Sequence, residues 1–306
     1  MRFLVVGAGS TGGYFGGRLA QAGRDVTFLV RPQRAAQLQA SGLQIQSPHG
    51  DVTLVPQLVQ AGQIAAPYDV IVLAVKGYAL EASLEDFAPA VGPRTVILPI
   101  LNGMRHIDRL RDRFGARAVA GGLCKCSTTL DAAGRIIHLN RAQQMSYGEL
   151  DGQPSTRMAQ IDAALQDAGF EARLSTDIAR EMWAKWFFLS ALAAITCLMR
   201  GSVGQVAATA HGADTARQIV DEVLAIITAV GMAPSPKAVA AAKEQLTEAG
   251  SPLAASMFRD LQAGLPVEAD EILGDLVARG AAAGVAAPLL TAAHVNLSVY
   301  AAGRSS

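Results

Sequence analysis

A glycine-rich segment near the N-terminus constrains the fold of this chain more than any other feature. The apolar run Phe3 to Val6 is typical of a buried strand, and Gly7-Ala8-Gly9-Ser10-Thr11-Gly12 follows it directly. A helical stretch to about Ala22 and a second strand, Asp25 to Val30, come next. Three glycines with this spacing between a strand and a helix predict a dinucleotide-binding fold.

Each residue of this segment has a physical role in holding a pyrophosphate. Gly7 permits the tight turn, Gly9 lets the backbone approach the anion, and Gly12 lets the helix pack closely on the strand. The free N–H groups at the helix start, at Ser10 and Thr11, and the helix dipole attract the negative charge. We therefore expect Gly7, Gly9, Ser10, Thr11 and Gly12 to bind the cofactor.

The end of the second strand indicates which dinucleotide is used. An acidic residue there accepts hydrogen bonds from the ribose 2′-hydroxyl of NAD, but this strand runs VTFLVRPQR and has Arg31 in that place. Arg31, together with Arg34, suits a 2′-phosphate and predicts NADPH as the cofactor. The alternative is that Arg31 is a solvated arginine at the start of a helix.

Two further buried strands end in polar residues that are candidates for the same site. YDVIVLAVKGY reaches Lys76, and PRTVILPILNGM reaches Asn102. In a doubly wound sheet the ligand crevice opens at the carboxyl ends of the strands, where both residues fall. Antiparallel strands follow over residues 116–150, and a helix is expected over 155–168.

After about Arg173 the sequence pattern changes from alternating strand and helix signals to alanine-rich helical periodicity. Glycine and proline mark the breaks between the expected helices, which cover residues 177–199, 213–230, 236–249, 252–262, 266–283 and 288–300. The sequence thus predicts an α/β protein with a Rossmann-like doubly wound sheet over residues 1–172 and an all-helical domain over 173–306. A length of 306 residues is enough for two cores.

Composition excludes several classes of partner. Lysine plus arginine and aspartate plus glutamate both number 26, so no charge bias favours nucleic acid or an anionic membrane. The longest uncharged helical run, Trp186 to Met199, is too short for a membrane span, and the N-terminal apolar run is too short for a signal peptide. Three scattered cysteines suggest neither disulfides nor a metal site. We expect a cytoplasmic protein that acts on a small molecule and binds no metal.

Lys185 is unusual because it lies in the apolar stretch EMWAKWFFLSALAAITCLMR, between Trp183 and Trp186. Burial of an amine among aromatic rings favours its neutral form, which suits an acid that gives up a proton near neutral pH. The alternative is a lysine whose stem covers apolar surface while its head stays in water.

The full set of motifs, in order, resembles the ketopantoate reductase (2-dehydropantoate 2-reductase) family. The set is GAGSTGG from Gly7, Arg31, Lys76, Asn102-Gly103-Met104, Trp183-x-Lys185, and Ser256-x-x-x-Asp260 followed by Glu268. The resemblance implies NADPH-dependent reduction of a 2-oxo acid to a 2-hydroxy acid, with ketopantoate reduced to pantoate in pantothenate biosynthesis as the first expectation.

The resemblance also implies roles for individual residues. Lys185 corresponds to the general acid of the family, and Glu268 to the glutamate that supports it. Ser256 and Asp260, one helical turn apart, correspond to substrate-side residues. Lys76 and Asn102 correspond to the lysine and asparagine on the nucleotide side, and Asn102 is also a substrate-binding candidate.

One departure from the family leaves the substrate open. Asparagines are expected one and two turns after the lysine, but Leu189 and Ala193 stand there. Ser190 or Thr196 could compensate. A reductase for a different, more apolar 2-oxo acid is therefore an alternative, and a non-catalytic NADP(H)-sensing protein is another. The alanine-rich helices also suggest a homodimer.

Overall fold

The computed structural model describes residues 1–304, which form two compact units. The first unit contains Met1–Leu101 and His106–Ala179; the second contains Asn102–Arg105 and the chain from Arg180 onward. The division expected at residues 172 and 173 lies inside a short strand, Glu171–Leu174, seven residues before the break between the units. The chain also enters the second unit briefly at Asn102, which the sequence did not predict.

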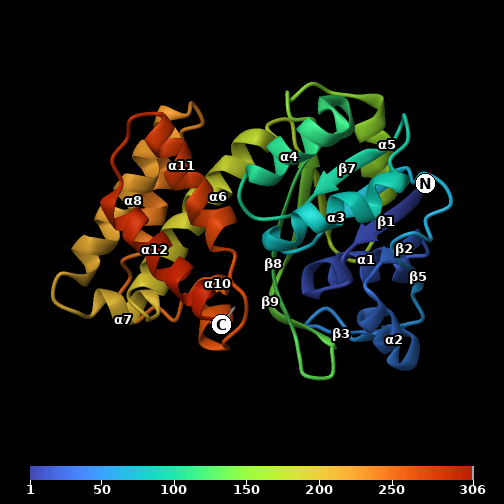
Figure 1. Cartoon of the computed structure of the whole chain (residues 1–306), viewed down its shortest axis with the longest axis horizontal. Helices are drawn as coiled ribbons and strands as arrows, with labels where there is room; N and C mark the ends of the chain where they lie inside the picture. The colour runs from blue at the N-terminus through green and yellow to red at the C-terminus, as the bar shows by residue number, and fades with distance from the viewer. Residues whose placement is uncertain (305–306) are drawn as a thin grey trace. The chain divides into compact units, whose positions relative to one another are not determined.

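A parallel five-stranded sheet forms the centre of the first unit (Figure 1). Its order is β5-β2-β1-β6-β7, so the chain moves outward from β1 and then returns to the other side of it. The order therefore reverses between β1 and β6, where doubly wound sheets bind their ligands. The strands are β1 (Arg2–Val6), β2 (Asp25–Leu29), β5 (Gln57–Val59), β6 (Val70–Leu73) and β7 (Val96–Pro99). The helices of this part are α1 (Ser10–Gln21), α2 (Pro32–Ser41), α3 (Leu80–Phe87) and α4 (Arg105–Phe114), with short 3₁₀ turns η1 (Gly77–Ala79), η2 (Ala88–Ala90) and η3 (Ala116–Ala118).

A second, mixed sheet completes the first unit. It has the order β10-β9-β3-β4, with β8 paired to β9. Its strands are β3 (Leu43–Gln46), β4 (Val52–Leu54), β8 (Gly121–Leu130), β9 (Ile136–Gly148) and β10 (Glu171–Leu174). Helix α5 (Thr156–Leu165) connects β9 to β10. The antiparallel pair β8–β9 was predicted from the sequence. The parallel pairings of β9 with β3 and β10 were not, because hydrophobic alternation does not specify which strands become neighbours.

Helix α1 lies against both sheets, and its glycines permit this. A Cβ at Gly16 would fall 2.6 Å from the Phe28 ring in the parallel sheet, and one at Gly17 would fall 2.7 Å from Ile45 in the mixed sheet. Its larger side chains, Tyr14, Phe15 and Leu19, are fully buried. The helix that follows the glycine-rich turn is therefore fixed by the core on two sides.

The second unit is helical. Its elements are α6 (Ile178–Leu198), which begins in the first unit, α7 (Val203–Ala207), α8 (Gly212–Ala229), α9 (Pro236–Gln245), α10 (Ser256–Gln262), the π turn η4 (Asp270–Gly274), α11 (Asp275–Ala282) and α12 (Pro288–Gly303). The expected helices are present, and the structure adds α7 and the π turn. Among the described residues, α6 alone is long and apolar enough to cross a membrane, and 67% of its most apolar window is buried inside the structure, as in a core helix.

Candidate active site

The turn after β1 has the geometry that a pyrophosphate requires. Gly7 has φ +95°, in the region that favours glycine. A Cβ at Gly12 would lie 2.1 Å from the Gly7 carbonyl oxygen, whereas one at Gly9 would meet no atom within 4 Å. The first and third glycines are thus needed for the fold itself. Gly9 instead leaves open space beside the backbone.

The start of α1 fits an anionic group. Gly9 is the N-cap residue and supplies no side-chain acceptor, and the first turn contains no acidic residue. The N–H groups at Ser10, Thr11 and Gly12 precede the first donor of the helical ladder, the Gly13 N–H, which donates to the Gly9 carbonyl at 2.9 Å. These residues could therefore hold the pyrophosphate of a dinucleotide.

The loop after β6 packs directly against this turn. Ala74 donates its N–H to the Val6 carbonyl at 3.0 Å, and a Cβ at Gly7 would lie 3.2 Å from Val75. Lys76 follows as an exposed residue at the start of η1. The structure thus places Lys76 immediately after the two residues that contact the glycine-rich turn.

The two arginines after β2 differ in what they contact. Arg31 is exposed at the N-terminus of α2. Arg34 instead donates to the Ala8 carbonyl at 3.0 Å and to the Gly134 carbonyl at 2.9 Å, and burial lowers the pKa of its guanidinium. Arg34 therefore ties the glycine-rich turn to the rest of the unit, which leaves Arg31 as the better candidate for a 2′-phosphate.

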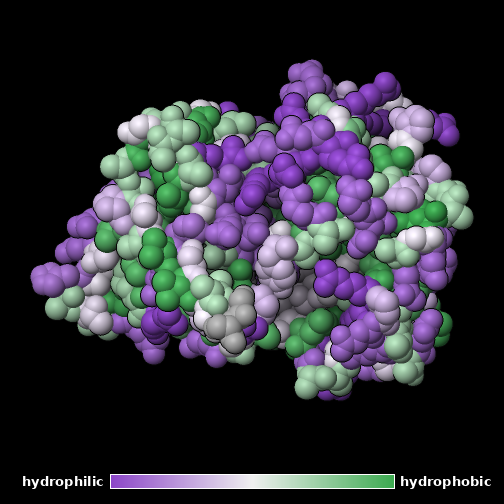
Figure 2. Space-filling model, viewed as in Figure 1, coloured by the Kyte–Doolittle hydropathy of each residue, from purple (hydrophilic) through white to green (hydrophobic). Residues whose placement is uncertain are grey.

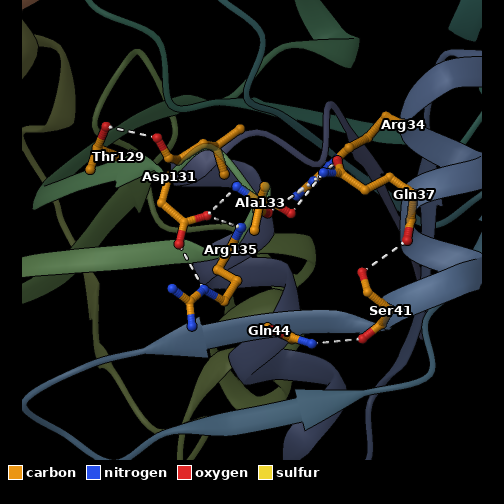
Figure 3. Close-up of polar contacts among 10 residues, drawn as sticks. Arg34, Gln37, Ser41, Gln44, Thr129, Asp131, Ala133 and Arg135 are labelled. Carbon is orange, nitrogen blue, oxygen red and sulfur yellow. Dashed lines mark hydrogen bonds and ion pairs between the residues drawn. The ribbon is translucent and has the colours of Figure 1, made fainter.

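The tip of the β8–β9 hairpin completes this attachment (Figure 3). Gln37 on α2 donates to the Ala133 carbonyl at 2.8 Å and accepts from Arg34 at 2.5 Å. Asp131 closes the tip by accepting from the Arg135 backbone and guanidinium, at 2.8 and 2.7 Å. The hairpin is thus hydrogen-bonded to α2, whose N-cap residue is Arg31.

Lys185 is less enclosed than the sequence suggested. Trp183, Trp186 and Phe187 are 7%, 1% and 1% exposed, whereas Lys185 is half-buried. In a helix the neighbours of residue 185 are three and four positions away, and those C-terminal to it are Phe188 and Leu189, also half-buried. Lys185 is therefore partly exposed rather than enclosed, whereas the three aromatic side chains beside it in the sequence are buried in the core.

Three segments meet in the second unit: the loop of residues 102–104 (the Asn102 loop), helix α6, which carries Lys185, and residues 268–274 (the Glu268 segment), which include the π turn η4. Gly103 has φ +82°, and a Cβ there would lie 2.6 Å from the Glu271 carbonyl oxygen and 3.9 Å from Trp186 Nε1. Glu268, two residues before the π turn η4, is 6% exposed. Asn102, next to Gly103, is half-buried. Three segments that are distant in sequence thus converge around Gly103.

Glu271 belongs to this group and was not selected from the sequence. Burial raises the pKa of its carboxyl above the usual range; the charges of Glu268 and Asp270 add to this, and Arg105 opposes it. The available signal was a run of three acids at one helix start, which the helix dipole alone explains equally well. Only the packing against the Asn102 loop distinguishes Glu271 from an ordinary residue of a first helical turn.

Ser256 and Asp260 belong to helix α10, which lies beside a different part of α6 from the Glu268 segment. They are one turn apart on α10, as predicted, and the Ala255 N–H before them donates to Thr196 Oγ1 at 3.4 Å. Thr196 is eleven residues after Lys185, which is roughly 16 Å along a helix axis. Helix α10 therefore lies beside the C-terminal half of α6, and the Glu268 segment lies beside the middle of α6.

The cysteines and the grouping of potential metal ligands are the last features of the site's chemistry. Among the described residues, Cys124, Cys126 and Cys197 form no disulfide, and burial raises the pKa of Cys126 and of Cys197 to about 12. Within residues 1–304, no three His, Cys, Asp or Glu side chains are grouped so that they could hold a metal ion.

Comparison with known families and proteins adds independent observations to this geometry. The profile described as Ketopantoate reductase PanE/ApbA matches residues 3–152, and that of Ketopantoate reductase PanE/ApbA C terminal matches residues 177–301. The chain belongs to the ketopantoate reductase family. This membership makes it an oxidoreductase that acts on a CH–OH group, with a nicotinamide cofactor and a 2-oxo acid as the substrate class.

Individual relatives and solved structures match nearly the whole chain. An uncharacterized oxidoreductase, YkpB, of Bacillus subtilis (strain 168) is 36% identical over 99% of both chains. The crystal structure of 2-dehydropantoate 2-reductase from Geobacter metallireducens GS-15 superposes with a TM-score of 0.87 at 28% identity, covering 98% of this chain and 99% of that one. A D-mandelate dehydrogenase, solved with NADH and anilino(oxo)acetate, has the same fold, with a TM-score of 0.87 at 20% identity over 100% of both chains.

Proposed function

We propose that this protein reduces the ketone of a 2-oxo acid with NADPH, with ketopantoate as the first candidate substrate and pantothenate biosynthesis as its setting. The observation that carries the proposal is the convergence of Asn102, the helix of Lys185 and the Glu268 segment around Gly103. A buried carboxylate and a half-exposed amine on adjoining segments suit a reaction that stabilises and protonates an oxygen.

The residues divide the chemistry between them. The glycine-rich turn from Gly7 to Gly12 would hold a nicotinamide nucleotide, which would supply hydride to the ketone carbon and leave negative charge on its oxygen. Lys185 stabilises that charge and donates the proton, and Glu268 orients the lysine and the substrate. Asn102, Ser256 and Asp260 bind the substrate. The unit with the parallel sheet binds the nucleotide, and the helical unit supplies the catalytic residues.

The removal of the Lys185 amine tests this assignment. Lys185→Ala should lower kcat by roughly 100- to 10,000-fold, because a positioned general acid contributes about that much. The Kd for NADPH, measured by nucleotide fluorescence, should stay within threefold. A near-normal kcat in this variant would remove Lys185 from the mechanism.

Arg31 supports NADPH rather than NADH as the reductant. Its exposed guanidinium stands where an acid would bind the 2′-hydroxyl of NAD. We expect at least a tenfold preference for NADPH in kcat/KM, and Arg31→Ala should abolish most of it by raising KM for NADPH alone. Equal use of the two nucleotides by the native enzyme would contradict the assignment.

A second candidate substrate has an apolar side chain. Leu189 shares the half-exposed face of α6 with Lys185, and Ala193 is buried. Ser190 and Thr196 do not compensate: both are fully buried, and they donate to the carbonyls of Ile272 and Leu192. The helix therefore offers fewer hydrogen bonds to a substrate hydroxyl than the family pattern leads one to expect.

One assay separates the candidates. NADPH oxidation is measured with ketopantoate, with 3-methyl-2-oxobutanoate and with phenylpyruvate. The second compound keeps the two methyl groups on the carbon next to the ketone but has hydrogen in place of the hydroxymethyl group. A higher kcat/KM for ketopantoate supports the first candidate, and the reverse supports the second. Absence of turnover with every 2-oxo acid, despite tight NADPH binding, would overturn the proposal in favour of a nucleotide sensor.

The outer face of α12 suggests self-association. Val295 and Val299 lie one turn apart and are 54% and 69% exposed. Figure 2 shows apolar residues over this part of the helical unit. We propose a homodimer, which light scattering after size exclusion tests directly.

A further inference from the structure

The π turn η4 is held by a side chain of the lysine helix. In this turn the Asp275 N–H donates to the Asp270 carbonyl, five residues earlier, so the helix contains an extra residue. Trp186 donates its indole N–H to the Ile272 carbonyl at 2.9 Å, and Ser190 Oγ contacts the same oxygen at 3.4 Å. Both donors are buried, at 1% and 0% exposure, so this attachment lies in the core.

The same turn is bonded to the segment that carries Glu268. The Ile272 N–H donates to the Glu268 carbonyl at 3.2 Å, while the Ile272 carbonyl accepts from Trp186. Ile272 therefore links the tryptophan of α6 to the backbone of Glu268 through two hydrogen bonds. The turn also packs against Gly103: a Cβ there would lie 2.6 Å from the Glu271 carbonyl oxygen and 3.9 Å from Trp186 Nε1.

We propose that Trp186 is a positioning residue whose indole N–H fixes the π turn and so sets Glu268 in register with Lys185. Lys185 and Trp186 are consecutive residues of one buried helix, so they move together. A shift of the π turn along α6 would change the separation of the amine and the carboxylate directly. The proposal rests on the proposed function, in which Glu268 orients Lys185.

A matched pair of substitutions isolates the hydrogen bond. Trp183 and Trp186 lie side by side, with ring centroids 5.2 Å apart, and both lie under the Arg279 guanidinium, at 5.8 and 5.7 Å. Trp186→Phe should lower kcat about tenfold with an unchanged KM for NADPH, and Trp183→Phe should change kcat less than twofold. Equal losses in the two variants would show that aromatic packing, not the hydrogen bond, matters.

A double-mutant cycle tests whether Trp186 acts through Glu268. In a Glu268→Gln background, Trp186→Phe should cause no further loss of kcat/KM for the 2-oxo acid. An equal tenfold loss in both backgrounds would overturn the proposal. If Trp186→Phe does not fold, Ser190→Ala serves instead: it removes the weaker contact to Ile272 and should lower kcat two- to threefold, again only when Glu268 is present.

The failure of this proposal differs from failure of the proposed function. If the native enzyme turns over no 2-oxo acid, the function is wrong and the positioning role falls with it. If the native enzyme is active but the cycle is additive, the function stands and Trp186 is a structural residue.

Discussion

Substitution of Gly103 by alanine tests the convergence of segments on which the site depends. Gly103 has φ +82°, and an L-residue in the left-handed region costs about 1–2 kcal/mol. The added Cβ would also lie 2.6 Å from the Glu271 carbonyl oxygen, so the loop and the π turn must separate by about 0.8 Å to reach ordinary contact. Such overpacking costs about 1–3 kcal/mol more.

Gly115 provides the matched control. It has the same φ of +82° and follows the helix α4 that begins just after Gly103, but a Cβ at Gly115 would meet no atom within 4 Å. Gly115→Ala should therefore cost only the backbone strain, about 1–2 kcal/mol in the free energy of unfolding. Urea unfolding of both variants measures the difference, which should be about 1–3 kcal/mol.

The two variants should also differ in catalysis. A displacement of nearly 1 Å at a positioning loop can cost about 100-fold, so Gly103→Ala should lower kcat/KM for the 2-oxo acid to that extent. Gly115→Ala should leave kcat/KM within twofold. If both variants lose equal stability and retain activity, the Asn102 loop does not pack tightly against the Glu271 turn, and the proposed site is wrong.

Three other expectations follow from charges and thiols. Glu222 on α8 accepts from the backbone N–H groups of Leu289 and Leu290, at 3.1 and 2.8 Å, so Glu222→Ala should cost about 1–2 kcal/mol in urea unfolding, as loss of a helix cap does. Because the folded protein raises the pKa of Glu271, the stability that this carboxyl contributes is present below its unfolded pKa and is lost as pH rises through the folded pKa. Glu271→Gln should therefore have a higher Tm than the native protein at pH 8, and the difference in Tm should shrink toward pH 4.5. Because burial raises the pKa of Cys126 to about 12, iodoacetamide at pH 8 should label it only after unfolding, as peptide mass mapping would show; rapid labelling of the folded protein would contradict this.

Local patterns in the sequence identified the nucleotide-binding part well. The β1 turn, the helix after it and the strands ending near Lys76 and Asn102 were all predicted, because they depend on residues close together in the chain. The parallel pairings of β9 were missed, since partners distant in sequence leave no local pattern. The burial of Lys185 was misjudged for a related reason: adjacent aromatic residues in a helix face different directions.

The sequence by itself determined the glycine-rich turn after β1, the change from an α/β part to a helical part, and the residue types at the candidate site. Glycine spacing and apolar periodicity act within a few residues, so they are present in the linear chain. The tertiary structure alone decided that Asn102 joins the helical unit, that Arg34 braces the glycine-rich turn, and that Trp186 holds the π turn after Glu268. Those features depend on contacts between side chains and backbone groups brought together only when the core packs.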